Sequence, residues 1–293
     1  MLQQSQSSFL RLVCLFLFLL VVLWPLLPQR LLWLFISMFI GINGISICRP
    51  GKQGASFVPT DISNLAYWYS ADSGITKDGS NLVSQWDDRS GNARNVTQAT
   101  AGNKPVYTVN QVNGLPAIVF DGSNDFMSFG SSIFTNTSNI TFFAVAKVTT
   151  ASQYATLFSQ YLTGALNAAA FQVCNNSGAL KMQTDVSLPK GMYGSTTIPL
   201  STYKCFTYRV APWSNVATNT ELWLNGVAET ETSYGGAGTP VLAAGNVYVG
   251  SFGVGGPTVT LNGGIAEIVI YNANLSDSDR GKVESYLIAK YAL

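Results

Sequence analysis

GIAEIVIYN at residues 264–272, followed by LSDSD at residues 275–279, is the stretch that decides the fold. Its apolar run predicts a buried strand, because isoleucine, valine and tyrosine suit a pleated sheet. Ser276, three residues before Asp279, is a helix-start signal. An apolar stripe at helical spacing follows at Val283, Leu287, Ile288 and Tyr291. We therefore expect a β-domain closed by one C-terminal helix.

Short predicted strands, separated by Gly, Asn and Pro turns, fill the chain before this segment. The expected ranges are 66–70, 82–87, 107–109, 117–120, 141–148, 156–160, 168–174, 180–184, 203–210, 221–224, 227–232, 247–251 and 265–271. Many short strands without a long helical period favour an all-β sandwich or barrel.

One hairpin is predicted in detail at Asn225-Gly226, a dipeptide that accepts the positive φ angles of a type I′ turn. Side chains alternate along a strand, so Leu222 and Leu224 share one face while Trp223 lies on the other.

Several motifs together resemble the laminin-G-like, concanavalin-A-like family of secreted jelly-roll domains. They are YWYSADSG at residues 67–74, WDDRSGN at 86–92, PAIVFDG at 116–122, FDGSND at 120–125 and LWLNG at 222–226. In this order, with the closing segment, they cover about Leu65 to Leu293. The resemblance implies a two-sheet antiparallel jelly-roll sandwich. It also implies carbohydrate, protein or cell-surface recognition, often with calcium, and by itself it implies no enzyme.

The N-terminal region has a different composition from the rest. The chain is 47% hydrophobic and 11% charged, and residues 10–47 are almost continuously apolar, with Arg30 in the middle. We expect a helical membrane-targeting segment over residues 1–48, as a signal anchor, a helical hairpin or a long signal peptide. Alternatively, translation starts downstream of part of it. A Gly- and Pro-containing linker over 49–57 then leads into the sandwich at 58–293.

Composition excludes several classes of chemistry. The chain has no histidine, which removes Ser-His-Asp and Cys-His catalysis and His-based zinc sites. The charges before Phe57 are all basic, and the sandwich has no run of Lys and Arg, so no nucleic-acid partner is expected. Cys174 and Cys205 lie in separate predicted strands, either as a disulfide or as two small buried residues.

One candidate metal site lies in the FDGSND turn. Asp121 and Asp125 bracket Gly122-Ser123-Asn124, and oxygen ligands crowded in a tight loop suit calcium. The alternative is ordinary turn chemistry, since Asp and Asn bond their own backbone in turns.

The candidate ligand-binding residues are two aromatic side chains in predicted loops. Trp213 and Tyr234 could stack on the apolar face of a sugar, or fold back over the sandwich edge. We therefore expect a non-catalytic recognition or adhesion module that binds glycans or surface proteins. It would be displayed outside the cell, secreted or membrane-anchored, or on a virion.

Two alternatives stay open: a purely structural virion or surface-layer component, and a glycoside hydrolase on the same sandwich. Glycosidases place paired carboxylates beside the scissile bond. Glu229 and Glu231 share a face of the predicted strand 227–232, but they lack the intervening Asp of the glucanase pattern. We therefore expect no enzyme.

Overall fold

A computed structural model describes residues 57–132, 134–150, 154–161, 169–186, 191–215, 219–235, 245–253 and 260–293. Residues 57–293 form one compact unit. The apolar segment predicted over residues 1–48, and all of the predicted linker except Phe57, lie outside the described residues. Within the described residues, no helix combines the length and the apolar composition needed to cross a membrane.

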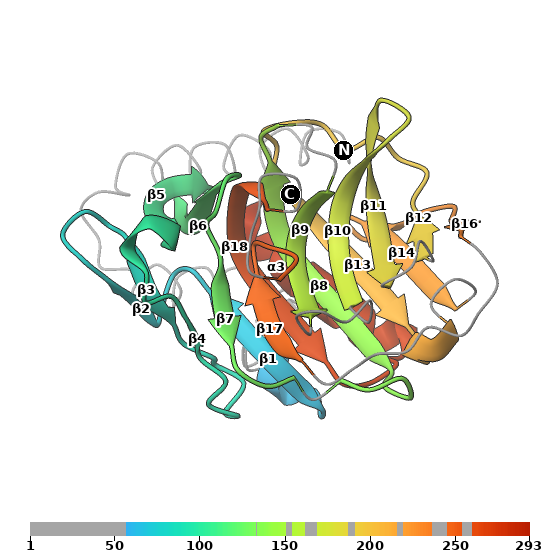
Figure 1. Cartoon of the computed structure of the whole chain (residues 1–293). Helices are drawn as coiled ribbons and strands as arrows, with labels where there is room; N and C mark the ends of the chain where they lie inside the picture. The colour runs from blue at the N-terminus through green and yellow to red at the C-terminus, as the bar shows by residue number, and fades with distance from the viewer. Residues whose placement is uncertain are drawn as a thin grey trace, which may run out of the picture. The chain divides into compact units, whose positions relative to one another are not determined.

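The described strands form two antiparallel sheets, seen as overlapping layers in Figure 1. The eight-stranded sheet runs in the order β15 (Val227–Ala228), β14 (Thr220–Leu224), β13 (Lys204–Val210), β8 (Ile140–Val148), β18 (Asn262–Tyr271), β6 (Leu115–Asp121) and β5 (Val106–Val112), and β1 (Leu65–Ser70) also pairs with β18. β18 is central, because it pairs with β8 on one side and with β6 and then β1 on the other.

The second sheet contains ten described strands. Its order is β16 (Thr232–Tyr234), β12 (Gly191–Tyr193), β11 (Ala179–Val186), β10 (Ala169–Asn176), β9 (Tyr154–Tyr161), β17 (Asn246–Val249), β7 (Met127–Phe129), β4 (Val96–Thr97), β3 (Val83–Trp86) and β2 (Ile75–Lys77). Of three short 3-10 helices, η1 (Pro59–Asp61) precedes β1, η2 (Ala101–Asn103) lies between β4 and β5, and η3 (Trp213–Asn215) lies between β13 and β14.

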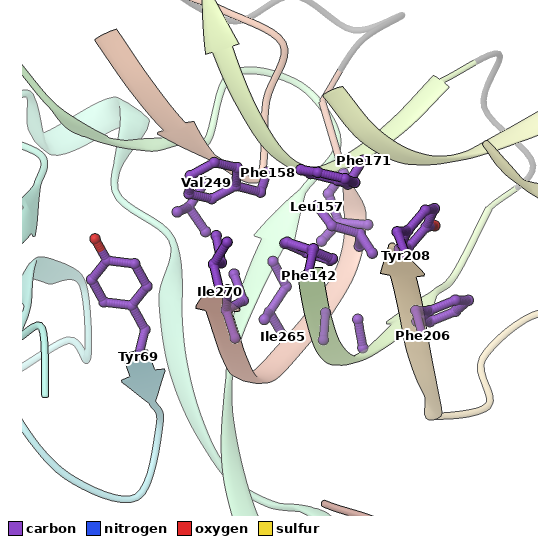
Figure 2. Packing of buried hydrophobic residues seen from close by; sticks show 14 of the residues in the cluster. Tyr69, Phe142, Leu157, Phe158, Phe171, Phe206, Tyr208, Val249, Ile265 and Ile270 are labelled. Carbon is purple, nitrogen blue, oxygen red and sulfur yellow. The ribbon is translucent and has the colours of Figure 1, made fainter. Parts of the chain in front are cut away.

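The main core lies between the two sheets. Figure 2 shows side chains of the eight-stranded sheet, such as Phe142 and Tyr208, facing Phe158 and Phe171 of the ten-stranded sheet. The rings of Phe142 and Phe171 stack with centroids 4.5 Å apart and planes 7° apart. Offset aromatic stacking adds to the free energy gained by burying the rings. Every second side chain along each strand therefore points inwards, and these side chains pack together between the two sheets.

A second apolar cluster covers the outer face of the eight-stranded sheet. Helix α3 (Asp277–Tyr291) packs Val283, Leu287 and Tyr291 against this face. The side chain of Ser276 accepts a hydrogen bond from the amide of Asp279 at 3.1 Å, as the helix-start signal predicts.

The structure confirms the all-β sandwich with two antiparallel sheets and a C-terminal helix. The hairpin is confirmed too, since Asn225 and Gly226 have φ angles of 50° and 75° between β14 and β15. Leu222 and Leu224 lie in the core between the sheets.

Candidate functional site

The outer face of the ten-stranded sheet differs from that of its partner sheet because it carries polar side chains. Gln172 on β10 lies opposite Gln183 on β11, with Thr156 on β9 beyond Gln172 and Tyr193 on β12 beyond Gln183. We call these four residues the glutamine row. Their neighbours along β10 and β11, such as Phe171 and Met182, point into the core, so alternation directs the row outward.

The two glutamines are buried, at 1% exposure each, and they are only partly satisfied. Gln172 donates through Nε2 to Oγ1 of Thr156 at 2.9 Å, and Gln183 donates through Nε2 to the hydroxyl of Tyr234 at 2.5 Å. Within the described protein, neither Oε1 atom has a hydrogen-bond partner. Because a buried polar group is normally hydrogen-bonded, each of these two adjacent acceptors can take a further donor, from a water molecule or from a ligand.

Tyr234 lies beside the row on β16. Its hydroxyl donates to the carbonyl oxygen of Thr184 at 3.0 Å. Its ring stacks on Tyr193 with centroids 4.4 Å apart, and both rings are partly exposed. A partly exposed aromatic pair offers the flat apolar surface on which a sugar ring can stack. Sequence reasoning placed Tyr234 in a loop, and the structure places it on an edge strand beside polar acceptors.

Gly191 makes this arrangement possible. It lies opposite Tyr234 in the register of β12 and β16. A Cβ atom at position 191 would lie 1.8 Å from the carbonyl oxygen of Thr184 and 2.9 Å from the hydroxyl of Tyr234. Only glycine therefore allows these two groups to meet across β12.

The structure does not support Trp213 as a ligand-stacking residue. Trp213 begins η3 and is fully buried, with its ring packed edge-on against Phe171 at 5.6 Å between centroids. A ring inside the core cannot stack on a sugar. The physical reason is that the loop folds inward and places the largest apolar side chain in the space between the sheets.

Asp121 and Asp125 come together as expected, but their oxygens bond to the turn itself. Asp121 accepts through Oδ1 from the amides of Ser123 at 2.7 Å and Asn124 at 3.3 Å, and Asp125 accepts through Oδ2 from the amide of Asp121 at 3.0 Å. Burial, followed by the charge of Asp121, raises the pKa of Asp125 to about 6. In the described residues, no group of three or more acidic or Cys side chains is placed to hold a metal ion. Calcium at this pair stays a prediction.

Glu229 and Glu231 do not lie on a shared strand, because β15 ends at Ala228. Glu229 accepts through Oε2 from the amide of Thr196 at 2.6 Å, and Glu231 accepts through Oε1 from the amide of Leu222 at 2.9 Å. Both acids therefore satisfy main-chain donors of neighbouring segments. Nothing in this geometry directs them together at one substrate bond.

Cys174 and Cys205 are both buried, and no disulfide joins them. Cys205 belongs to the cluster beneath α3, on the outer face of the eight-stranded sheet, whereas Cys174 lies on β10 of the other sheet. The disulfide alternative is therefore wrong, and two small buried residues are observed.

Sequence reasoning missed Thr156, Gln172, Gln183 and Tyr193. The available signal was one glutamine in each of two neighbouring strands, Gln172 in AAFQVC and Gln183 in ALKMQTDV, between residues that face the core. Their register across β10 and β11, which places the two amides side by side, comes only from the structure.

The comparisons with known proteins support the fold. No family model matches the chain, and no curated protein sequence matches it. Among solved structures, domain 4 of AbnA, an extracellular GH43 arabinanase from Geobacillus stearothermophilus in complex with arabinotriose, superposes with a TM-score of 0.51 at 17% identity. That match covers 76% of this chain and 98% of the domain. At this identity the likeness establishes the fold alone.

Two further similar structures are larger enzymes. An arabinofuranosidase in complex with arabinofuranosyl-α-1,2-xylobiose gives a TM-score of 0.49 at 16% identity, with 72% of this chain and 51% of the other covered. A Trypanosoma rangeli sialidase gives 0.48 at 12% identity, with 78% and 33% covered. This chain thus spans about half of the first enzyme and a third of the second.

These findings correct the predicted function. The similar structures come from glycoside hydrolases, and domain 4 of the arabinanase is part of such an enzyme. They run against a non-catalytic recognition or adhesion module and against the expectation that the chain is no enzyme. The alternative, a role in glycan processing, is taken up below as a proposal.

Proposed function

We propose that the chain is a glycan-processing protein whose sandwich holds an oligosaccharide at the glutamine row. The observation that carries this proposal is the pair of buried Oε1 atoms of Gln172 and Gln183, which have no partner within the described protein. Sugar hydroxyls donate hydrogen bonds of the kind these oxygens need. Next to them, the stacked rings of Tyr193 and Tyr234 supply an apolar surface.

The similar fold of an arabinanase domain in complex with arabinotriose supports the choice of glycan and suggests the first probe. Isothermal titration of the full-length chain with arabinotriose, xylotriose and cellotriose tests binding, and reducing-end release from the matching polysaccharides tests hydrolysis. We expect saturable binding of at least one oligosaccharide and release of reducing ends from its polymer. If the chain shows no binding of any of these oligosaccharides and no release of reducing ends, the proposal is overturned.

Glu229 and Glu231 are the paired carboxylates expected from the sequence, and although they do not share a strand, their variants test whether either one acts in hydrolysis. Glu229→Gln and Glu231→Gln should each leave binding at the glutamine row unchanged. If either acid acts on the bond, its variant loses reducing-end release while it still binds the oligosaccharide. Melting temperatures must accompany this assay, because each acid also caps a main-chain amide.

The proposal also includes membership in the laminin-G-like family and a location outside the cell or on a virion. Membership in the laminin-G-like family rests on the sequence motifs, and the sandwich is compatible with it. Secretion or membrane anchoring through residues 1–48, with the sandwich outside the cell or on a virion, rests on the apolar composition of that segment. Fractionation of cells that express the full chain, followed by protease treatment of intact cells, tests this location.

A further inference from the structure

We infer that the glutamine row selects neutral glycans over anionic ones, and that Tyr234 is the positioning residue that fixes this choice. The inference rests on the proposed function and deepens it, because it assigns the substrate class. It depends on which way the amide of Gln183 faces.

The hydroxyl of Tyr234 determines that orientation. A tyrosine hydroxyl has one proton to donate, and Tyr234 donates it to the carbonyl oxygen of Thr184. Towards Gln183 the hydroxyl can therefore only accept. The amide therefore presents its NH₂ group to Tyr234, and Oε1 points away from that hydroxyl, where no described group donates to it. A flipped amide would bring two oxygens together with no proton between them.

The glutamine row consequently presents acceptors to a ligand. The Oε1 atoms of Gln172 and Gln183 need donors, and the hydroxyl groups of a neutral sugar supply them. A carboxylate of a uronic or sialic acid is an acceptor only, so it would meet oxygen lone pairs in a buried place. In the described residues, no Lys or Arg side chain donates to either oxygen.

The nearest cation along the strand does not change this conclusion. Lys181, two residues before Gln183 on β11, donates through Nζ to the carbonyl oxygen of Ser195 at 2.8 Å. Its ammonium group is thus engaged away from the row. The local backbone also holds Tyr234 in place, because Gly191 leaves room for its hydroxyl to reach Thr184.

The test measures affinities of the full-length chain for a matched pair of ligands. Trigalacturonic acid and its fully methyl-esterified form differ in charge at the carboxyl groups. Arabinotriose and sialyllactose extend the comparison to a neutral and an anionic glycan of other types. We expect the neutral ligands to bind at least tenfold more tightly by isothermal titration. Equal or tighter binding of the anionic member of the pair overturns the inference.

The decisive variant is Tyr234→Phe, which keeps the ring on Tyr193 and removes the hydroxyl. Without that hydroxyl the amide of Gln183 is free to turn, so we expect the neutral-to-anionic affinity ratio to fall at least fivefold. Gln183→Met removes the acceptor and should weaken neutral binding at least tenfold. A merely structural role for Tyr234 would lower the melting temperature and leave the ratio unchanged, and that result overturns the inference.

Tyr107→Phe is the matched control. Tyr107 is a partly buried residue of β5 in the other sheet, so the same loss of a hydroxyl should leave the affinity ratio unchanged. The two proposals fail in distinguishable ways. A wild-type chain that binds and cleaves no glycan overturns the proposed function together with the inference. A chain that binds glycans without a preference for neutral ones overturns the inference alone.

Discussion

Burial and a neighbouring charge act on one carboxyl group at Asp125. Burial, with the charge of Asp121 as the second cause, raises the pKa of Asp125 to about 6 in the folded chain, whereas an unfolded aspartate has a pKa near 3.9. The folded state therefore holds the proton more tightly. This contribution to the free energy of unfolding is fully present below about pH 4 and is lost as pH rises to about 6.

Asp125→Asn should remove this pH dependence. Asparagine cannot ionise, yet its side-chain oxygen can still accept from the amide of Asp121. We expect the variant to gain about 1 to 2 kcal/mol over wild type between pH 4 and pH 7. Chemical denaturation at pH 4, 5, 6 and 7 measures the difference. Parallel stability curves for the two proteins would contradict the prediction. In Asp121→Asn, the loss of stability should shift to lower pH, since one cause of the raised pKa is gone.

Calcium binding at the FDGSND turn is a second prediction about single residues. An ion bound only by the folded chain stabilises it by mass action, and it must displace the proton of Asp125. Millimolar calcium should therefore raise the melting temperature more at pH 7 than at pH 5, and Asp125→Asn should blunt the rise. Magnesium at equal ionic strength is the control. If calcium does not shift the melting temperature, Asp121 and Asp125 serve only in hydrogen bonds within the turn.

Helix α3 is held to the sheet by a buried ion pair as well as by apolar contact. Glu267 on β18 is fully buried and accepts hydrogen bonds from Nε1 of Trp68 at 2.7 Å, the hydroxyls of Tyr286 at 2.9 Å and Tyr291 at 2.8 Å, and Nζ of Lys290 at 2.6 Å. Three of these donors belong to the helix. One acidic side chain thus joins β1, β18 and α3.

Glu267→Gln should destabilise the sandwich strongly. Glutamine removes the charge that faces Lys290, which keeps Asp72 as a partner at 2.9 Å, and leaves several donors one acceptor short, so we expect a cost near the lower end of the range of about 3 to 5 kcal/mol for a broken buried pair. Urea denaturation followed by tryptophan fluorescence measures the loss. Lys282→Met is the matched control, because Lys282 pairs with Asp279 on the exposed face of α3 at 2.7 Å. Such a surface pair contributes about 0 to 1 kcal/mol. Equal losses in the two variants would contradict this role for Glu267.

Elements with a long apolar run could be predicted from the sequence, and short ones could not. β8, β13, β18 and α3 were expected close to their observed ranges. β4, with two residues, and β2, β7, β12 and β16, with three each, carry too few residues for an alternating pattern to stand out. The expected strand over 227–232 divides at Glu229, because that side chain turns to the amide of Thr196.

A register shift explains a further difference within β18. Strict alternation would place Ile265 on the same face as Val269. The pairing with β8 shifts between Ile265 and Glu267, so Ile265 faces the core between the sheets while Ala266 and Val269 face α3. An extra residue of this kind is a β-bulge. No pattern in GIAEIVIYN indicates it.

At the scale of the whole molecule, the sandwich should fold without the residues that precede it. Residues 57–293 form a compact unit with their own core. Expressing this range should give a soluble, monomeric protein with β-type circular dichroism and one cooperative unfolding transition. A helix-rich or insoluble product would contradict the division at Phe57. The full-length chain, prepared in parallel, is the comparison.

The fold class followed from the sequence because alternation, turn residues and a capped final helix each act locally. The glutamine row did not, because it forms across strands that only the folded sheet brings into register. The position of Trp213 could not be predicted from the sequence either. Its predicted loop left two alternatives open, stacking on a sugar or folding back over the sandwich edge, and the space between the sheets decided its burial.

The central place of β18 has a consequence for biosynthesis. β1, β6 and β8 all pair with it, and all three are translated well before it. A nascent chain that has reached β13 therefore exposes strand edges that await their shared neighbour, and unpaired edges invite pairing with other chains. Such distant pairings also slow folding. A ribosome that stalls before residue 262 would accordingly release an aggregation-prone fragment, and chaperone demand should peak over that interval.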